Sequence, residues 1–241
     1  MPEPTSQPTR HPIAFRLVAI GCAAFVILTL IAMFLYAGGS RFNPGRTHYD
    51  FFDNFFSDLG GTRTPSGKKN LVPMVLFATA MVCAASSVAL FFWAIQHFHR
   101  ERRLARRLSR MTALMGLLIG LGFLGVAATP WNVALHAHVV VVHATFRLMF
   151  FTVLLATILL WREKTMPRRF AAVFAGLSVL VLTYSILLAY GPRVRSPAGR
   201  KVQVIGQKVV VYASIGAIGL QTLSADRLIR QRAAQRSDRE G

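Results

Sequence analysis

The sequence predicts an all-α integral membrane protein, built as a bundle of six transmembrane helices. Of its 241 residues, 54% are hydrophobic and 15% are charged, whereas a soluble domain carries about 25% charged residues. The apolar residues gather in blocks of roughly 20 to 28, long enough to cross a hydrocarbon core of about 30 Å at 1.5 Å per residue. Turns rich in Pro and Gly, and clusters of Arg, separate these blocks.

Six blocks are expected to form the spans, and together they predict one domain over residues 13–226. The expected spans are Leu17–Gly38, Leu71–Ile95, Met111–Ala128, Ala134–Trp161, Phe170–Tyr190 and Val202–Leu223. The last of them is the most polar at its start, where it carries Gln203, Gln207 and Lys208. A Pro-rich stretch at residues 1–12 is expected to be a disordered tail, and residues 227–241 a basic tail.

The basic charge is distributed unevenly between the two sides of the expected bundle. The net charge is +19. If both termini are cytoplasmic, 17 of the Lys and Arg residues lie on the inner side and nine on the outer side, as the positive-inside rule requires. The charge therefore indicates topology and attraction to anionic inner-leaflet headgroups, not nucleic-acid binding. Compact loops and the preference for Arg over Lys favour a bacterial inner (plasma) membrane.

The loop after the first span contains a periodic segment at residues 49–61. Apolar residues at 51, 52, 55, 56 and 59 alternate with polar residues at 50, 53, 54, 57 and 58, which is a 3.6-residue period. We therefore expect a short amphipathic helix at the outer interface between the first two spans. Its polar face is acidic, so we expect that face to turn towards the bundle.

The fourth span carries an unusual set of ionisable side chains. His136, His143 and Arg147 fall within about 20° of one another on a helix, whereas His138 points the opposite way. Ionisable groups at this depth are costly and generally face the bundle interior. We therefore expect His136, His143 and Arg147 to form a polar stripe that faces the other spans.

The stripe needs an acidic partner, and no Asp or Glu lies inside an expected span. Because the stripe opens on the outer side, the nearest acids are those of the first outer loop. We expect Asp53 or Asp58 to meet the stripe and Lys208 to join it. This predicts an outward-facing ligand site; its residues are Asp53, Ser57, Asp58, His136, His143, Arg147 and Lys208.

Three kinds of site fit this set of residues. The first is a buried polar network that fixes helix packing. The second is a site for an anionic headgroup or amphiphile, with Arg147 and Lys208 as partners of a phosphate. The third is a metal-assisted hydrolase with His136, His143 and an Asp as ligands, and with Ser57 or a metal-bound water as the nucleophile.

The spacing of the histidines argues against the hydrolase. His136 and His143 are two turns apart, about 10 Å along a helix, which is long for one zinc ion with bonds near 2 Å. The sequence therefore predicts neither a metal nor another cofactor.

Short motifs in the same regions resemble those of a known group of membrane proteins. They are Phe56-Ser57-Asp58-Leu59-Gly60, Thr64-Pro65, Asn70, and His143 with Phe146, Phe150 and Phe151. These residues resemble the corresponding segments of the DRAM/Frag/Sfk membrane proteins. Pro130 before His136, and Gly206-Gln207-Lys208, make the chain similar to a prokaryotic family, domain of unknown function nine-nine-eight.

The resemblance implies six spans and shared positions at Ser57, Asp58 and His143. It also implies roles connected with lipids or membrane trafficking. We therefore expect a non-enzymatic membrane protein that binds or helps to move a lipid or similar amphiphile through an outward-facing polar pocket. A membrane-embedded lipid hydrolase and a structural or regulatory membrane subunit are the alternatives, and the oligomeric state stays open.

Overall fold

The chain folds as six long helices joined by short connections and one longer loop. A computed structural model describes residues 10–96, 103–163 and 167–240. Its helices are α1 (Arg10–Phe34), η1 (Phe56–Asp58, 3₁₀), α2 (Leu71–Ile95), α3 (Arg103–Ala128), α4 (Leu135–Arg162), α5 (Arg168–Tyr190) and α6 (Pro197–Glu240). All six α-helices include a stretch long and apolar enough to cross a membrane. The predicted six-transmembrane-helix bundle is therefore confirmed.

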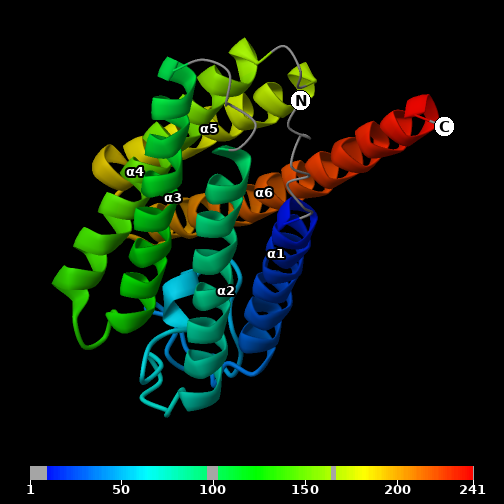
Figure 1. The fold of residues 1–241 in the computed structure, drawn as a ribbon. Coiled ribbons are helices and arrows are strands. Elements are labelled where there is room, and N and C mark those ends of the chain that lie inside the picture. The colour runs from blue at the N-terminus through cyan, green and yellow to red at the C-terminus, as the bar shows by residue number, and fades with distance from the viewer. Residues whose placement is uncertain (1–9, 97–102, 164–166, 241) are drawn as a thin grey trace.

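The six helices form a closed ring. Each helix packs against the next one along the chain, and α6 returns to pack against α1. Helix α1 begins, and α6 ends, at the same end of the bundle, which we call the terminal end (Figure 1). The loop of residues 35–70 covers the opposite, loop end, and we call this loop the cap (Figure 1). A ring of this kind encloses a central space that every helix can line.

Two glycines one turn apart bring α2 and α3 close together. A Cβ atom on Gly120 would lie 2.9 Å from the carbonyl oxygen of Ala85, and one on Gly116 would lie 2.7 Å from Cβ of Phe92. Small residues four apart are a common device for close helix packing in membranes. The contact between α2 and α3 therefore depends on the missing side chains of Gly116 and Gly120.

Several helix boundaries differ from those predicted. Helix α1 begins at Arg10, so the last residues of the expected tail 1–12 are helical; residues 1–9 lie outside the described part of the chain. Helix α3 begins at Arg103, eight residues before the expected start. Helix α6 begins at Pro197, since proline suits the first turn of a helix, and continues to Glu240. Most of the predicted basic tail 227–241 therefore extends α6.

The predicted short helix in the cap is reduced to the three-residue 3₁₀ helix η1, and the other residues of 49–61 fold as turns around it. Side chains here replace the backbone hydrogen bonds of a helix: Asp50 Oδ1 accepts from the N–H groups of Phe52 and Asp53, at 2.9 and 3.2 Å. Asn54 Oδ1 accepts from the Asp50 N–H at 2.9 Å. Asp and Asn often favour turns in this way. The predicted inward orientation of the acids is nevertheless confirmed for Asp58, which is buried.

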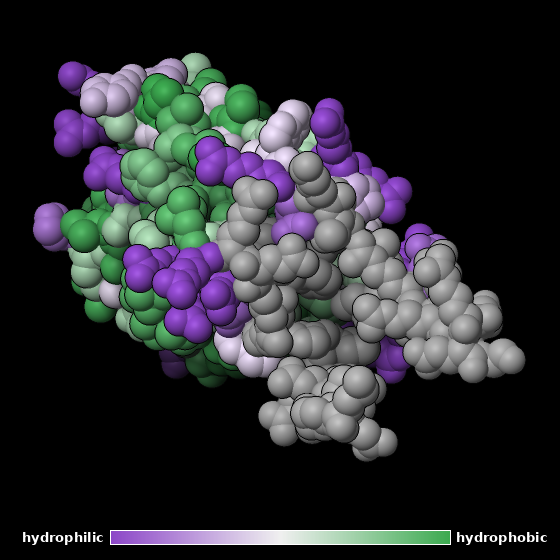
Figure 2. Space-filling model, turned by 45° about the horizontal axis from the view of Figure 1, so that its top comes forward, coloured by the Kyte–Doolittle hydropathy of each residue, from purple (hydrophilic) through white to green (hydrophobic). Residues whose placement is uncertain are grey.

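Hydrophilic residues gather at the terminal end of the bundle. Figure 2 looks obliquely onto this end and shows hydrophilic residues there, while hydrophobic residues cover the sides of the bundle in view. Among the described residues, the basic ones near this end include Arg103, Arg106, Arg107, Arg168 and Arg169. The bundle therefore has a basic end and an apolar girdle, as a membrane-spanning protein requires.

Candidate functional site

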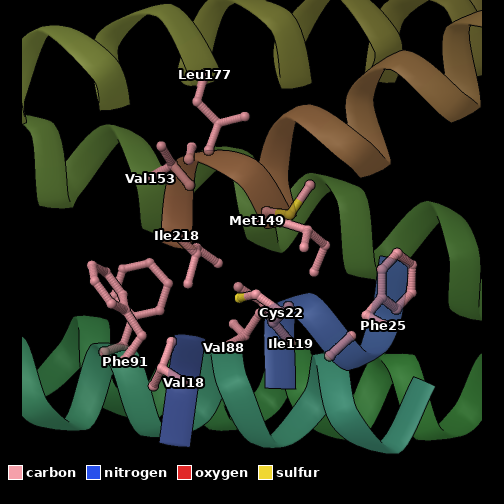
Figure 3. Packing of buried hydrophobic residues seen from close by; sticks show 14 of the residues in the cluster. Val18, Cys22, Phe25, Val88, Phe91, Ile119, Met149, Val153, Leu177 and Ile218 are labelled. Atoms are coloured by element: carbon pink, nitrogen blue, oxygen red, sulfur yellow. The ribbon is translucent and has the colours of Figure 1, made fainter. Parts of the chain in front are cut away.

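The helix ring encloses an apolar cavity of about 60 Å³. All six α-helices and η1 contribute to its wall; representative residues are Phe25, Ala84, Phe123, Met149, Leu177 and Ile218. Side chains from α4, α5 and α6 converge there on side chains from α1 and α2 (Figure 3). On α2 the lining residues extend from Phe77 to Phe92, about 22 Å along the helix axis. The cavity is therefore elongated along the bundle.

Polar side chains that line the cavity fall into two groups. Thr145 and Ser214 donate to carbonyls of their own helices, at 2.7 and 2.6 Å. Ser57 and Gln207 lie at the loop end. Among the described residues, Gln207 makes one side-chain hydrogen bond, through its oxygen, and none is found for its amide nitrogen or for the Ser57 hydroxyl. Unused hydrogen-bonding capacity is therefore concentrated where the cavity meets the cap.

A buried ion pair ties the cap to α6. Oδ2 of Asp58 accepts hydrogen bonds from the Arg200 guanidinium and the Asn54 amide, both at 2.9 Å, and from the Phe55 N–H at 3.0 Å. Burial raises the pKa of the Asp58 carboxyl, and the Arg200 charge, the Asn54 amide and the Phe55 N–H oppose that rise. Three donors thus compensate the carboxylate for the water that it loses.

Lys208 is held by a cage of aromatic rings. Its side chain is buried, and its ammonium group donates to the carbonyl of Asn54. The ammonium nitrogen also lies 5.3, 4.9 and 6.0 Å from the ring centres of Tyr49, Phe51 and Phe56. Cation–π attraction of this kind strengthens where water is excluded. The charge of Lys208 therefore interacts with groups of the cap.

Further contacts join the same face of α6 to the cap. The Arg200 guanidinium lies 4.8 Å from the ring centre of Phe55. The side-chain oxygen of Gln207 accepts from the Phe56 N–H at 2.8 Å. Arg200, Gln207 and Lys208 thus hold η1 and the residues before it against α6, at the loop end of the cavity.

The structure brings together part of the predicted site. Asp58 and Lys208 lie in one buried cluster, as expected. The backbone of Asp53 joins them, because its carbonyl accepts from Nε of Arg200 at 2.7 Å. Ser57 lies beside them but faces the cavity. Whether these residues bind a ligand stays a prediction.

The predicted stripe on α4 does not join this cluster. His136 and Arg147 are exposed, His143 is half-buried, and it is His138 that is buried, with Nδ1 2.7 Å from the carbonyl oxygen of Thr129. The stripe does lie on one face, but the prediction that this face turns inward is wrong. Apolar residues occupy both sides of α4, and the packing turns the side with Phe146 to the cavity.

Sequence reasoning missed Arg200, Asn54 and the role of Gln207. Gln207 and Lys208 follow Arg200 by seven and eight residues, about two helical turns, which places all three on one side of the helix. The predicted start of the last span at Val202 places Arg200 in a loop, and this boundary hides the pattern. Pro197 was the available sign of an earlier helix start.

The expected ligands of a metal-dependent hydrolase are not assembled. Among the described residues, no group of three or more His, Cys, Asp or Glu side chains lies close enough to hold a metal ion. His136 and His143 face away from the cavity side of α4, whereas Asp58 is enclosed by the cap. The described geometry therefore supplies no metal-based mechanism.

These features define a multi-pass α-helical membrane protein with a central apolar cavity and a polar cap. The model of the Frag1/DRAM/Sfk1/Cwh43P N-terminal domain matches residues 14–192, and the chain belongs to this family. The predicted similarity to the DRAM/Frag/Sfk proteins is thus confirmed. The match covers α1 to α5 and the cap and ends before α6. No curated protein and no solved structure matches the chain.

Proposed function

We propose that this protein binds a membrane amphiphile, with a hydrocarbon tail in the central cavity and an uncharged polar end at Ser57 and Gln207. The main observation behind this proposal is the elongated apolar cavity, lined by all six spans. It ends at the Ser57 hydroxyl and the Gln207 amide nitrogen, for which no partner is found among the described residues. Apolar cavities exclude water and accept apolar ligands. A hydrocarbon chain would supply the dispersion contacts that the cavity walls lack.

The charges of the cap favour an uncharged ligand end. Arg200 is paired with Asp58, and Lys208 is enclosed by aromatic rings. A phosphate would have to disrupt these contacts, at the cost of breaking a buried ion pair. A hydroxyl, ester or amide would instead meet the free groups of Ser57 and Gln207. This replaces the expectation of a phosphate held by Arg147 and Lys208, which the structure places apart.

The orientation follows from the distribution of charge. The terminal end carries the larger share of basic residues, so the positive-inside rule places it in the cytoplasm and the cap outside. In a bacterial inner membrane, the basic end would then meet anionic inner-leaflet headgroups. A tail bound in the cavity would come from the surrounding bilayer.

Blocking the cavity tests the proposal. Ala84 and Ser214 line it from different helices, so Ala84→Phe and Ser214→Phe each place a ring in the ligand volume. Val82 is half exposed on the outside of α2, so Val82→Phe adds the same ring without reaching the cavity. Co-purified lipid is measured by native mass spectrometry after gentle release from detergent, and folding by the thermal midpoint.

We expect bound amphiphile on the wild type and on Val82→Phe, and loss of it from a folded Ala84→Phe or Ser214→Phe variant. Two cavity variants are used, so that the test still applies if one of them does not fold. Unchanged lipid occupancy in a folded plugged variant, or a wild type that carries no amphiphile, would contradict the proposal.

A further inference from the structure

The outward face of α4 carries a regular seam of exposed residues. We call this the α4 seam; it consists of Ala137, Val140, Ala144, Arg147, Phe151, Leu154 and Ile158, all of them exposed. Their separations alternate between three and four residues. This is the a/d spacing with which two helices pack along a left-handed crossing. The spacing therefore suits a further helix laid against the outside of the ring.

Arg147 lies at mid-membrane depth on this seam. It is about halfway between Trp131 and Trp161, the aromatic residues at the two ends of the span. The distance along α4 is about 18 Å to Leu135 and about 22 Å to Arg162. An exposed arginine at the centre of a bilayer is costly, and such residues normally pair with another group. A seam that faced only lipid would leave this charge without a partner.

Among the acidic residues whose side chains the structure describes, none is placed to pair with Arg147. Asp50, Asp53 and Asp58 belong to the cap, and Glu163 and Asp226 lie towards the terminal end. A second copy of this chain would not supply an acidic partner either, because its acidic residues occupy the same places. A two-fold pairing through this seam would also place two copies of Arg147 near each other, where like charges repel. An acidic partner for Arg147 would therefore have to come from a different protein.

We propose that the α4 seam docks a transmembrane helix of a partner protein that carries an Asp or Glu at mid-membrane depth. Ala137 and Ala144 allow close approach in the half of the seam nearest the cap. His136 and His143 flank these alanines and can hydrogen-bond polar groups of the partner. A carboxylate opposite Arg147 would form the charge-assisted pair that the chain does not supply.

This inference is independent of the ligand in the cavity. The seam lies on the outside of α4, whereas Thr145, Phe146 and Met149 line the cavity on its inside. Loss of ligand binding and loss of partner binding can therefore be measured separately.

The test uses synthetic transmembrane peptides of defined chemistry. Leu/Ala peptides with one central Glu or one central Gln are titrated against the reconstituted full-length protein in phosphatidylcholine vesicles, with energy transfer as the readout. Arg147→Gln removes the charge from the seam. Arg162→Gln, an exposed arginine at the end of the same helix, is the matched control.

We expect the wild type and Arg162→Gln to bind the Glu peptide about tenfold more tightly than the Gln peptide. Arg147→Gln should bind both peptides equally and weakly. The proposal fails if the wild type does not distinguish the peptides, or if the preference survives Arg147→Gln. It also fails if the labelled protein associates with itself through Arg147, because the seam would then belong to a second copy.

Discussion

At the scale of single residues, the Asp58–Arg200 pair carries the contact between the cap and α6. The two side chains are 7% exposed or less, and their atoms are 2.9 Å apart. Removal of one partner from a buried pair typically costs about 3–5 kcal/mol, since it leaves an uncompensated charge. We therefore expect Asp58→Asn and Arg200→Gln each to lower the free energy of unfolding by about that amount.

The Arg230–Asp226 pair provides the control for this prediction. It has the same 2.9 Å separation, but the Arg230 side chain is 55% exposed. Exposed pairs one helical turn apart contribute about 0.3–0.5 kcal/mol. Denaturant unfolding in detergent should therefore show a small effect for Arg230→Gln. Equal effects for Arg200→Gln and Arg230→Gln would show that burial does not strengthen the first pair.

Ser57 offers a second residue-scale prediction. Its hydroxyl makes no hydrogen bond within the described chain, so Ser57→Ala should change the free energy of unfolding by less than about 0.5 kcal/mol. If the hydroxyl meets the ligand, the same change should lower the affinity for the co-purified amphiphile several-fold. Back-titration of the delipidated protein measures this effect.

Ser66 is the matched control within the cap. Its hydroxyl lies 2.7 Å from that of Thr64 and donates to the Gly38 carbonyl at 3.2 Å. Ser66→Ala should therefore leave the ligand affinity unchanged and lower stability instead. A ligand affinity that is insensitive to Ser57→Ala would remove this serine from the proposed site.

At the scale of the helices, close approach of α2 and α3 should limit substitution at Gly120. Its new Cβ would meet a backbone carbonyl at 2.9 Å, and a backbone atom cannot give way unless the helices separate. We expect Gly120→Ala to lower the free energy of unfolding by about 1–3 kcal/mol. The thermal midpoint in detergent provides the measurement.

Gly176 on α5 is the corresponding control, because a Cβ there would have no neighbour within 4 Å. Gly176→Ala should be neutral or stabilising by up to about 1 kcal/mol through helix propensity. If both alanines lower the midpoint alike, the loss of glycine itself, and not the α2–α3 contact, would be responsible.

At the scale of the whole molecule, the orientation in the membrane is open to a direct test. Lys68 is exposed in the cap and Arg106 is exposed near the terminal end, so each can carry a reporter cysteine in a background without Cys22 and Cys83. An impermeant maleimide applied to intact cells should label Lys68→Cys. Arg106→Cys should be labelled after permeabilisation only. The reverse pattern would invert the proposed topology.

The six spans could be predicted because hydropathy and segment length are local properties of the chain. The inward position of Asp58 and the place of Lys208 could also be predicted, since no expected span contains an acid and Lys208 is the one charged residue of the expected span Val202–Leu223. The helical period likewise placed His136, His143 and Arg147 on one face of α4. None of these inferences required knowledge of how distant segments meet.

Rotation of each helix and the pairing of distant residues depend on the assembled ring. Arg200 meets Asp58 across 142 positions of sequence, and only the packing of α6 on the cap brings them together. The outward turn of Arg147 follows from the fit of Phe146 and Met149 against the cavity, because both sides of α4 are apolar enough to be buried. A local pattern specifies a face, but the surrounding helices determine which way that face points.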